Sequence, residues 1–322
     1  MIEFQRLLLG DTVRNSAFFR ALKAAIVPGK TIVADIGSGT GYLSFLAEKL
    51  GAKECHLYEV SDLLPLSRTL AAENGVKRCK FFQTHSTEVK NPPKVDLVIS
   101  ETLGNYALEE NIVETMNDAR RFLKPDGLMI PQSLTQCAAP VTSSRLYDEL
   151  NVWDRVGHGL TFDTAKTMCM NNMYVKDISA EDLHPLSRTE RSEVWGRGPG
   201  GGGCWDTIDF RKKNASIRRA TMEWKAKTDI ILYGFALWWE ATLFKNITLT
   251  TSPFAPSTHW KQIYLPVVDP LLMKKGQTIR LNIRSDCRYT VKINLEWETI
   301  ILDAKGGEIK KTQQDMRKGY LA

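Results

Sequence analysis

The fold prediction rests on the stretch VADIGSGTGYLS at residues 33–44. An apolar run leads into three glycines at alternate positions, Gly37, Gly39 and Gly41, and a segment with helical spacing follows. Glycines at a strand-to-helix turn let a ligand approach the backbone, and the first amides of the helix stay free to bind it. The third glycine of the dinucleotide fingerprint is absent, because Tyr42 stands in its place. The loop therefore predicts a nucleoside ligand without a pyrophosphate.

Two acidic residues accompany this loop. Asp35 comes just before the first glycine, and Glu59 ends the next strand-like run, CHLYEV, 22 residues after Gly37. A carboxylate at that second position is placed to accept hydrogen bonds from both ribose hydroxyls. The loop alone would be a weak signal, but together with these acids it predicts a nucleoside site strongly.

The chain changes its pattern at about residue 134. Before it, strand-like and helix-like segments alternate, which is typical of a parallel sheet covered by helices on both faces. After it, stretches of period two such as ILYGFALWWEATL at 231–243 indicate antiparallel strands of a barrel or sandwich. We therefore predict two domains, residues 1–134 and residues 135–322.

Composition and charge exclude several classes of protein. The net charge is only +6, and residues 135–322 hold the whole excess with 27 basic and 21 acidic residues, far from the density of a nucleic-acid arm. The longest apolar stretch, IILYGFALWW at 230–239, is well short of the roughly 20 residues that a membrane span needs. The N-terminus has no signal-peptide pattern. We expect a cytoplasmic protein that binds neither nucleic acid nor membranes.

The cysteines and glycines suggest further features. The six cysteines form no CxxC pair and no His lies at metal-ligand spacing, so we expect free thiols and no metal site. The tract GRGPGGGG, within a predicted loop at 187–205, is interpreted as a mobile linker, with an arginine-glycine interaction motif as the alternative.

Four segments of the sequence are similar to the protein arginine methyltransferases, a family of class I S-adenosylmethionine-dependent methyltransferases. They are LLLGDTVRNSAFFRAL at 7–22, ISETLGNYALEEN at 99–111, ARRFLKPDGLMIPQ at 119–132 and STHWKQIYLPV at 257–267. They occur in the family's order. The resemblance implies a Rossmann-like methyltransferase domain, an antiparallel β-barrel-like domain, a helical dimerisation arm within about 146–180, and a homodimer. Candidate buried contacts of the arm, for which packing within one subunit is an equal alternative, are Trp153, Met168, Met170 and Met173.

The acids of the second segment suit the chemistry of that family. A guanidinium stays protonated and delocalises its lone pairs, so it is a poor nucleophile, and the sulfonium methyl donor is also a cation. Two carboxylates gripping the planar guanidinium supply negative charge and orient the attacking nitrogen, without a metal. The resemblance implies this catalytic and substrate-binding role for Glu101 and Glu110, with Glu109 as the adjacent alternative.

The resemblance also implies roles for residues elsewhere. His259 and Asp11 would orient the site or pass a proton onward, although Asp11 is equally a helix cap. Trp260 would wall the substrate pocket, and Thr258 would help to place its loop. The cofactor would be S-adenosyl-L-methionine, with S-adenosyl-L-homocysteine as product. The residues implied to bind it are Arg14, Asp35, Gly37, Gly39, Glu59 and Glu88.

The chain departs from the family at several positions. Thr102 and Asn105 stand where the family usually has tryptophan and tyrosine, and Leu8 and Ile112 stand where it has methionines. The usual Tyr-Phe-x-x-Tyr lid is expected to be missing, shortened or built differently. The expected substrate is a protein or peptide arginine, with free L-arginine or another guanidino compound as the alternative. Two competing hypotheses are a catalytically silent regulatory partner and a small-molecule methyltransferase with a different acceptor.

Overall fold

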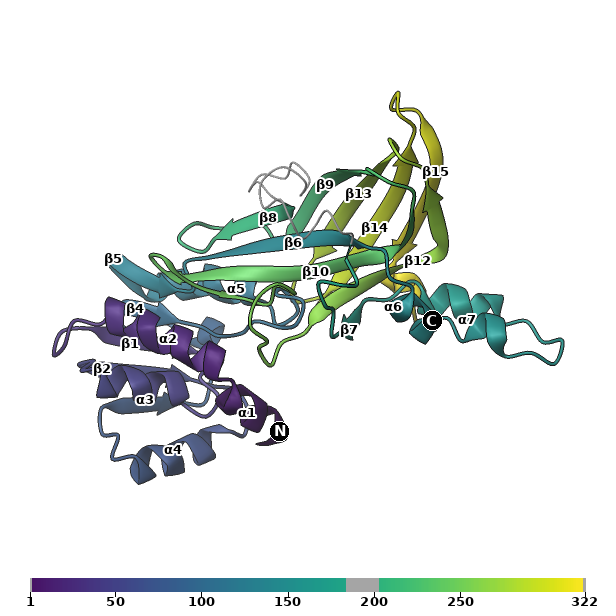
Figure 1. The fold of residues 1–322 in the computed structure, drawn as a ribbon. Coiled ribbons are helices and arrows are strands. Elements are labelled where there is room, and N and C mark those ends of the chain that lie inside the picture. The colour runs from purple at the N-terminus through teal and green to yellow at the C-terminus, as the bar shows by residue number, and fades with distance from the viewer. Residues whose placement is uncertain (1, 184–202, 321–322) are drawn as a thin grey trace.

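The computed structural model describes residues 2–183 and 203–320. The first part of the chain builds a parallel sheet beside two N-terminal helices, α1 (Ile2–Gly10) and α2 (Thr12–Ala25) (Figure 1). The strand order is β3-β2-β1-β4-β5. The strands are β1 (Ile32–Ile36), β2 (Glu54–Tyr58), β3 (Cys79–Phe82), β4 (Val95–Ile99) and β5 (Leu123–Ile130). The helical segments between them are α3 (Tyr42–Lys49), α4 (Leu64–Glu73), η1 (Ser86–Glu88), α5 (Ile112–Ala119) and η2 (Arg120–Phe122). This arrangement confirms the predicted Rossmann-like fold.

One helix is shorter than the sequence pattern predicts. The stretch NIVETMNDARRFLKPDG at 111–127 has helical spacing up to its Pro-Asp-Gly turn, but α5 ends at Ala119 and that turn lies inside β5. A register shift in the pairing of β4 with β5 accommodates the turn residues. The Lys124 ammonium also lies 2.7 Å from a carboxylate oxygen of Asp96 on β4, which holds the segment beside the sheet.

The second part of the chain consists of antiparallel sheets. One has the order β7-β12-β10-β6-β8, with β11 beside β10, and the other has the order β15-β14-β13-β9. The first comprises β6 (Ser133–Val141), β7 (Tyr174–Lys176), β8 (Cys204–Asp209), β10 (Ile230–Phe244), β11 (Ile247–Thr250) and β12 (Gln262–Met273). The second comprises β9 (Ile217–Lys225), β13 (Thr278–Asp286), β14 (Asn294–Leu302) and β15 (Glu308–Asp315), and a turn η5 (Met316–Lys318) follows.

Helix α2 fixes the two parts relative to each other. It lies against α3 of the first part and against β10 and β11 of the second. Its side chains Phe18, Ala21 and Leu22 are fully buried and belong to one apolar core that continues into both sheet systems. The two parts of the chain are therefore held together by one continuous apolar core.

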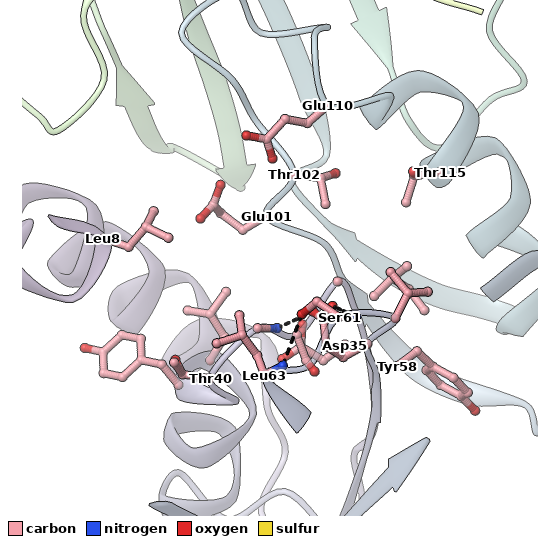
Figure 2. Close-up of a pocket in the computed structure, with 18 of the residues that line it drawn as sticks. Leu8, Asp35, Thr40, Tyr58, Ser61, Leu63, Glu101, Thr102, Glu110 and Thr115 are labelled. Carbon is pink, nitrogen blue, oxygen red and sulfur yellow. Dashed lines mark hydrogen bonds between the residues drawn. The ribbon is translucent and has the colours of Figure 1, made fainter. Parts of the chain in front are cut away.

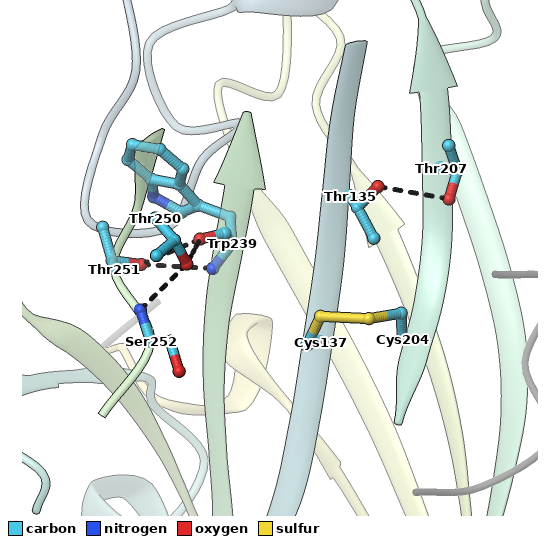
Figure 3. Close-up of a disulfide and its surroundings, with 8 residues drawn as sticks. All are labelled: Thr135, Cys137, Cys204, Thr207, Trp239, Thr250, Thr251 and Ser252. Atoms are coloured by element: carbon cyan, nitrogen blue, oxygen red, sulfur yellow. Dashed lines mark hydrogen bonds between the residues drawn. A yellow bond between two sulfur atoms is a disulfide. The ribbon is translucent and has the colours of Figure 1, made fainter. Parts of the chain in front are cut away.

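Two cysteines correct the expectation of free thiols. Cys137 on β6 and Cys204 on β8 are partners in the strand register and form a disulfide (Figure 3). Directly opposed residues on antiparallel strands place their side chains on the same face and close together, which spacing along the sequence does not reveal. Cys204 and Trp205 also open β8, inside the predicted loop. The rest of that loop, with most of the glycine tract, lies outside the described residues.

The helical segment within the predicted arm projects away from the sheets (Figure 1). It contains α6 (Arg145–Leu150), the turn η3 (Trp153–Arg155) and α7 (Asp163–Cys169). Met170 is fully buried within the subunit, whereas Leu160 at the connection of η3 to α7 is 63% exposed. Among the described residues, no helix is both long and apolar enough to span a membrane.

Candidate active site

A cavity of about 330 Å³ opens at the carboxyl ends of the parallel strands (Figure 2). Its lining comes from helix α1, from the glycine loop after β1, and from the residues that follow β2, β3 and β4. Ligands of open α/β sheets bind at this edge, because the loops that follow the strands converge there.

The glycine loop has the backbone shape that the sequence predicts. Gly37, Gly39 and Gly41 have φ values of +72°, +54° and +83°, in the left-handed region that favours glycine. A Cβ at Gly37 would lie 2.9 Å from the Thr102 methyl group. Gly37 therefore leaves no room for a side chain, and the loop lines the cavity.

Two acids flank the loop. Glu59 accepts hydrogen bonds from the backbone amides of Gly39 and Ser61, both at 2.8 Å. Asp35 accepts a hydrogen bond from the Ser44 hydroxyl at 2.7 Å. Complete burial, opposed by that hydrogen bond and reinforced by the charge of Glu59, raises the pKa of Asp35 to about 7. Both acids line the cavity, as the sequence predicts.

Glu101 and Glu110 face each other across the cavity (Figure 2). Glu101 follows the end of β4, and Glu110 lies at the far end of the loop before α5. The loss of hydration in this setting, followed by the charges of Glu101 and Glu109, raises the pKa of Glu110 to about 7. A cation placed between the two carboxylates would remove this repulsion.

Arg14 lies beside this pair. Its Nε donates to Glu101 at 3.0 Å, and a terminal nitrogen of its guanidinium contacts the same carboxylate oxygen. The side chains of Arg14 and Glu101 are each only 7% exposed, and both residues line the cavity. The guanidinium is therefore held at the cavity by its pairing with Glu101.

The structure distinguishes Glu110 from Glu109. The carboxylate of Glu109 turns back onto its own loop and accepts a hydrogen bond from the Asn105 amide at 2.9 Å. This fold-back requires Gly104, where a Cβ would lie 2.1 Å from the Glu109 side chain. Glu110 lines the cavity and Glu109 does not, so the geometry favours Glu110 as the partner of Glu101.

Asp11 makes both of the contacts that the sequence suggested. It caps helix α2 by accepting from the Arg14 amide at 2.8 Å, and it accepts from the backbone amide and from Nδ1 of His259, each at 2.8 Å. Because the carboxylate accepts, Nδ1 of His259 carries the proton. The opposite nitrogen, Nε2, is buried and without a hydrogen-bond partner among the described residues. Neither residue lines the cavity, so the pair supports the site from behind Arg14.

The position of Trp260 corrects the expectation that it walls the pocket. Its indole nitrogen donates to the backbone oxygen of Leu103 at 2.7 Å, and its ring packs edge-on against Trp239 with centroids 5.0 Å apart. Trp239 in turn donates to the Gly104 oxygen at 3.1 Å. These indoles satisfy two carbonyls of the Glu101–Glu110 loop, and neither tryptophan lines the cavity. The Thr258 hydroxyl donates to the Trp260 oxygen at 3.2 Å, which places this loop.

Comparison with known families shows the family to which the chain belongs. Residues 133–313, more than half of its length, match the family described as the PRMT5 oligomerisation domain, and residues 29–188 match a methyltransferase domain family. The chain belongs to the protein arginine methyltransferase family. The resemblance that the sequence suggested is thereby confirmed.

The individual relatives of this chain are distant. The histone-arginine methyltransferase CARMER of Drosophila yakuba is 28% identical over 315 residues, 93% of this chain and 58% of the relative. The corresponding protein of Drosophila persimilis is 28% identical and 57% covered. The chain thus spans less than two thirds of the length of these relatives.

Two solved structures share the fold of this family member. One is the Trypanosoma brucei PRMT1 enzyme-prozyme heterotetrameric complex with AdoHcy, with a TM-score of 0.80, 22% identity, and coverage of 97% of this chain and 96% of that one. The other is Arabidopsis thaliana protein arginine methyltransferase 10, with a TM-score of 0.78, 20% identity, and 98% coverage of both chains.

Two expectations about the residues around the cavity change. Helix α1 lines the cavity with Phe4, Gln5 and Leu8, so it contributes part of the cover that the sequence left open. Glu88 is exposed, accepts a hydrogen bond from the Thr84 hydroxyl at 3.0 Å, and does not line the cavity. The short turn η1 carries it to the surface. Cavity-lining residues that sequence reasoning missed include Thr84, His85, Ser86, Thr115 and Tyr289.

Proposed function

We propose that the chain is an S-adenosyl-L-methionine-dependent N-methyltransferase that acts on the guanidino group of arginine in a protein or peptide. The observation that carries this proposal is the pair Glu101 and Glu110, which face each other across a cavity bounded by a nucleoside-type glycine loop. A neutral oxygen or carbon acceptor would gain little from two facing carboxylates, whereas a planar cation can hydrogen-bond to both.

The residues present fit the cofactor. Glu59 can accept from ribose hydroxyls, the open backbone of Gly37 and Gly39 admits close approach, and Arg14 can pair with a carboxylate. When bound, the cofactor supplies an electrophilic methyl group on a positively charged sulfur. Its positive charges would favour the ionised form of Asp35, whose pKa burial raises to about 7.

The chain's own residues orient the acceptor and take the proton. Glu101 and Glu110 would hold the guanidinium with one nitrogen directed toward the methyl group that the cofactor would supply. Once methylated, that nitrogen would carry one proton more than the product, and a group of the chain would have to take this proton. Glu110, whose pKa is raised to about 7 in the unliganded site, is the carboxylate that we assign to accept this proton. Glu101 is paired with the Arg14 guanidinium and serves to orient the acceptor.

The histone-arginine methyltransferase names of the Drosophila relatives support a protein arginine as substrate. The test offers labelled S-adenosylmethionine with histones, an Arg/Gly-rich peptide and free L-arginine in parallel. We expect label on a polypeptide and its loss in Glu110→Gln. Label on free L-arginine alone would show that the substrate is the free amino acid and not a polypeptide. Cofactor binding without transfer to any guanidino acceptor would contradict catalysis and favour a silent partner.

We also propose that the protein forms a homodimer through the helical arm. The match to an oligomerisation-domain family covers this segment. The arm exposes apolar side chains that a partner subunit could bury, namely Val152, Val156, Leu160 and Phe162. Light scattering at micromolar concentration tests this assembly, with Leu160→Lys as the variant expected to dissociate it. A wild-type monomer would refute the proposal.

A further inference from the structure

A loop of the antiparallel part reaches the far end of the cavity. Tyr289 lies between β13 and β14, and it is the only residue from that part among the described residues that line the cavity. Its side chain is 40% exposed, so the core does not require it. It lines the cavity together with His85 and Thr115.

The loop is anchored to the first domain by two acceptor atoms of one side chain. The carboxylate of Glu114 on α5 accepts from the backbone amide of Tyr289 and, through its other oxygen, from the Ser216 hydroxyl, both at 2.9 Å. The Cys287 amide donates to the Ser216 oxygen at 2.9 Å, which ties the start of the loop to the same point. Tyr289 is therefore held at the cavity by its backbone.

The Tyr289 side chain makes a second set of contacts at the cavity. Its hydroxyl lies 3.3 Å from the Thr115 hydroxyl, and its ring stands edge-on to His85 with centroids 5.9 Å apart and an interplanar angle of 73°. Two aromatic rings from different domains thus meet at this end of the cavity.

The sheet order shows which part of a nucleoside would reach these rings. The strands run β3-β2-β1-β4, so Glu101 after β4, Glu59 after β2 and His85 after β3 follow one another along the edge. With the donor methyl near Glu101 and the ribose at Glu59, the base extends toward β3. This assignment rests on the proposed function.

We propose that Tyr289 is a cofactor-binding residue, contributed by the second domain, that forms with His85 an aromatic wall for the purine base. Aromatic side chains bind nucleobases by stacking and edge contacts, since every base has a π-face. The first domain alone would leave this end of the cavity open, so cofactor affinity depends on the docking of the β13–β14 loop.

Calorimetric binding of S-adenosylhomocysteine and of 5′-methylthioadenosine, which lacks the amino-acid part, tests this role. Tyr289→Ala should weaken both ligands by the same factor, about tenfold. Tyr289→Phe keeps the ring and should restore affinity to within about threefold of wild type, as expected for the loss of one hydroxyl contact. Arg288→Ala, a matched control in the same loop whose side chain pairs with Asp286, should bind both ligands normally.

Two comparisons separate this inference from the proposed function. Arg14→Ala should weaken only S-adenosylhomocysteine, because methylthioadenosine has no carboxylate. Glu114→Ala, which removes the loop anchor without altering a cavity-lining residue, should weaken methylthioadenosine severalfold. If Tyr289→Ala or Glu114→Ala folds and binds methylthioadenosine like wild type, the aromatic wall is refuted and the proposed function stands. If wild type binds neither nucleoside, the proposed function itself fails.

Discussion

The raised pKa of Glu110 predicts how methyl transfer depends on pH. Glu110 must be ionised to hold a guanidinium, and its surroundings raise its pKa to about 7. Because the shift is upward, the carboxylate is protonated below this value and charged above it. Activity should therefore rise as the pH increases through 7, the opposite of a site that needs a protonated acid.

The size of the effect follows from the ionised fraction. With a pKa of about 7, about a tenth of Glu110 is charged at pH 6 and about nine tenths at pH 8, so kcat/KM for the free enzyme should rise about tenfold. Bound S-adenosylmethionine adds a positive charge nearby and should shift the rise to lower pH. Glu110→Gln should lose the rise and reduce kcat/KM by about ten- to a hundredfold, the range for a charged hydrogen bond.

Glu109→Gln is the matched control, since it removes the same charge one position away. Its amide oxygen can still accept the Asn105 amide, so the loop should keep its shape. Activity should stay within about threefold of wild type. The rise in activity should move to a slightly lower pH, because the charge of Glu109 contributes to the raised pKa of Glu110.

The assay is initial-rate transfer of labelled methyl to an Arg/Gly-rich peptide from pH 5.5 to 9, with cofactor affinity measured separately. A wild-type rate that is flat across this range would contradict the role assigned to Glu110. Loss of activity in Glu109→Gln with activity retained in Glu110→Gln would also contradict it.

Three further predictions concern the frame of the site. Gly41→Ala should abolish cofactor binding in titration calorimetry, because a Cβ there would lie 2.5 Å from the Ser67 hydroxyl at a φ of +83°; normal binding would contradict the packing. Cys137→Ser should lower the free energy of unfolding in urea by about 4 kcal/mol without reductant and leave it unchanged with reductant, as the closed loop of 67-residue separation predicts. If a non-reducing digest yields no disulfide-linked Cys137–Cys204 peptide, this stability prediction fails. Asp11→Ala should lower the thermal midpoint in calorimetry through loss of a helix cap worth about 1 kcal/mol; an unchanged midpoint would show that other contacts hold α2.

The sequence predicted those strands whose burial follows from their own pattern. β1 and β4 are apolar runs buried on both faces, and β10 and β13 show clear apolar character or alternation. The pattern does not predict β15, because its sequence EIKKTQQD is largely exposed, and pairing with β14 rather than burial makes it a strand. β9 likewise carries several charged residues on an exposed face. Such strands are determined by their neighbours in space, which one sequence does not show.

The residues of the candidate site likewise fall into those that the sequence predicts and those that depend on tertiary contacts. Glu101, Glu59 and the glycine loop lie at the ends of strands, where the order of elements places side chains at one edge of the sheet. By contrast, His85 and Tyr289 meet only because a loop of the second domain docks on α5. The orientation of Trp260 also depended on tertiary contacts, since its indole nitrogen finds its acceptor on the distant loop that carries Glu101.

The second domain shapes the acidic site as well as bounding it. The backbone amide of Lys261 donates to the Asn105 side chain at 2.8 Å, and the indoles of Trp239 and Trp260 bind the same loop through its carbonyls. These contacts hold Glu110 near Glu101 despite their repulsion, which a free loop would relieve by moving apart. The side chain of Asn105, in place of the family's usual tyrosine, makes one of these ties. The same rigidity keeps the two carboxylates ready for a cation. Folding has already brought the like charges together, so the ligand does not have to do so when it binds.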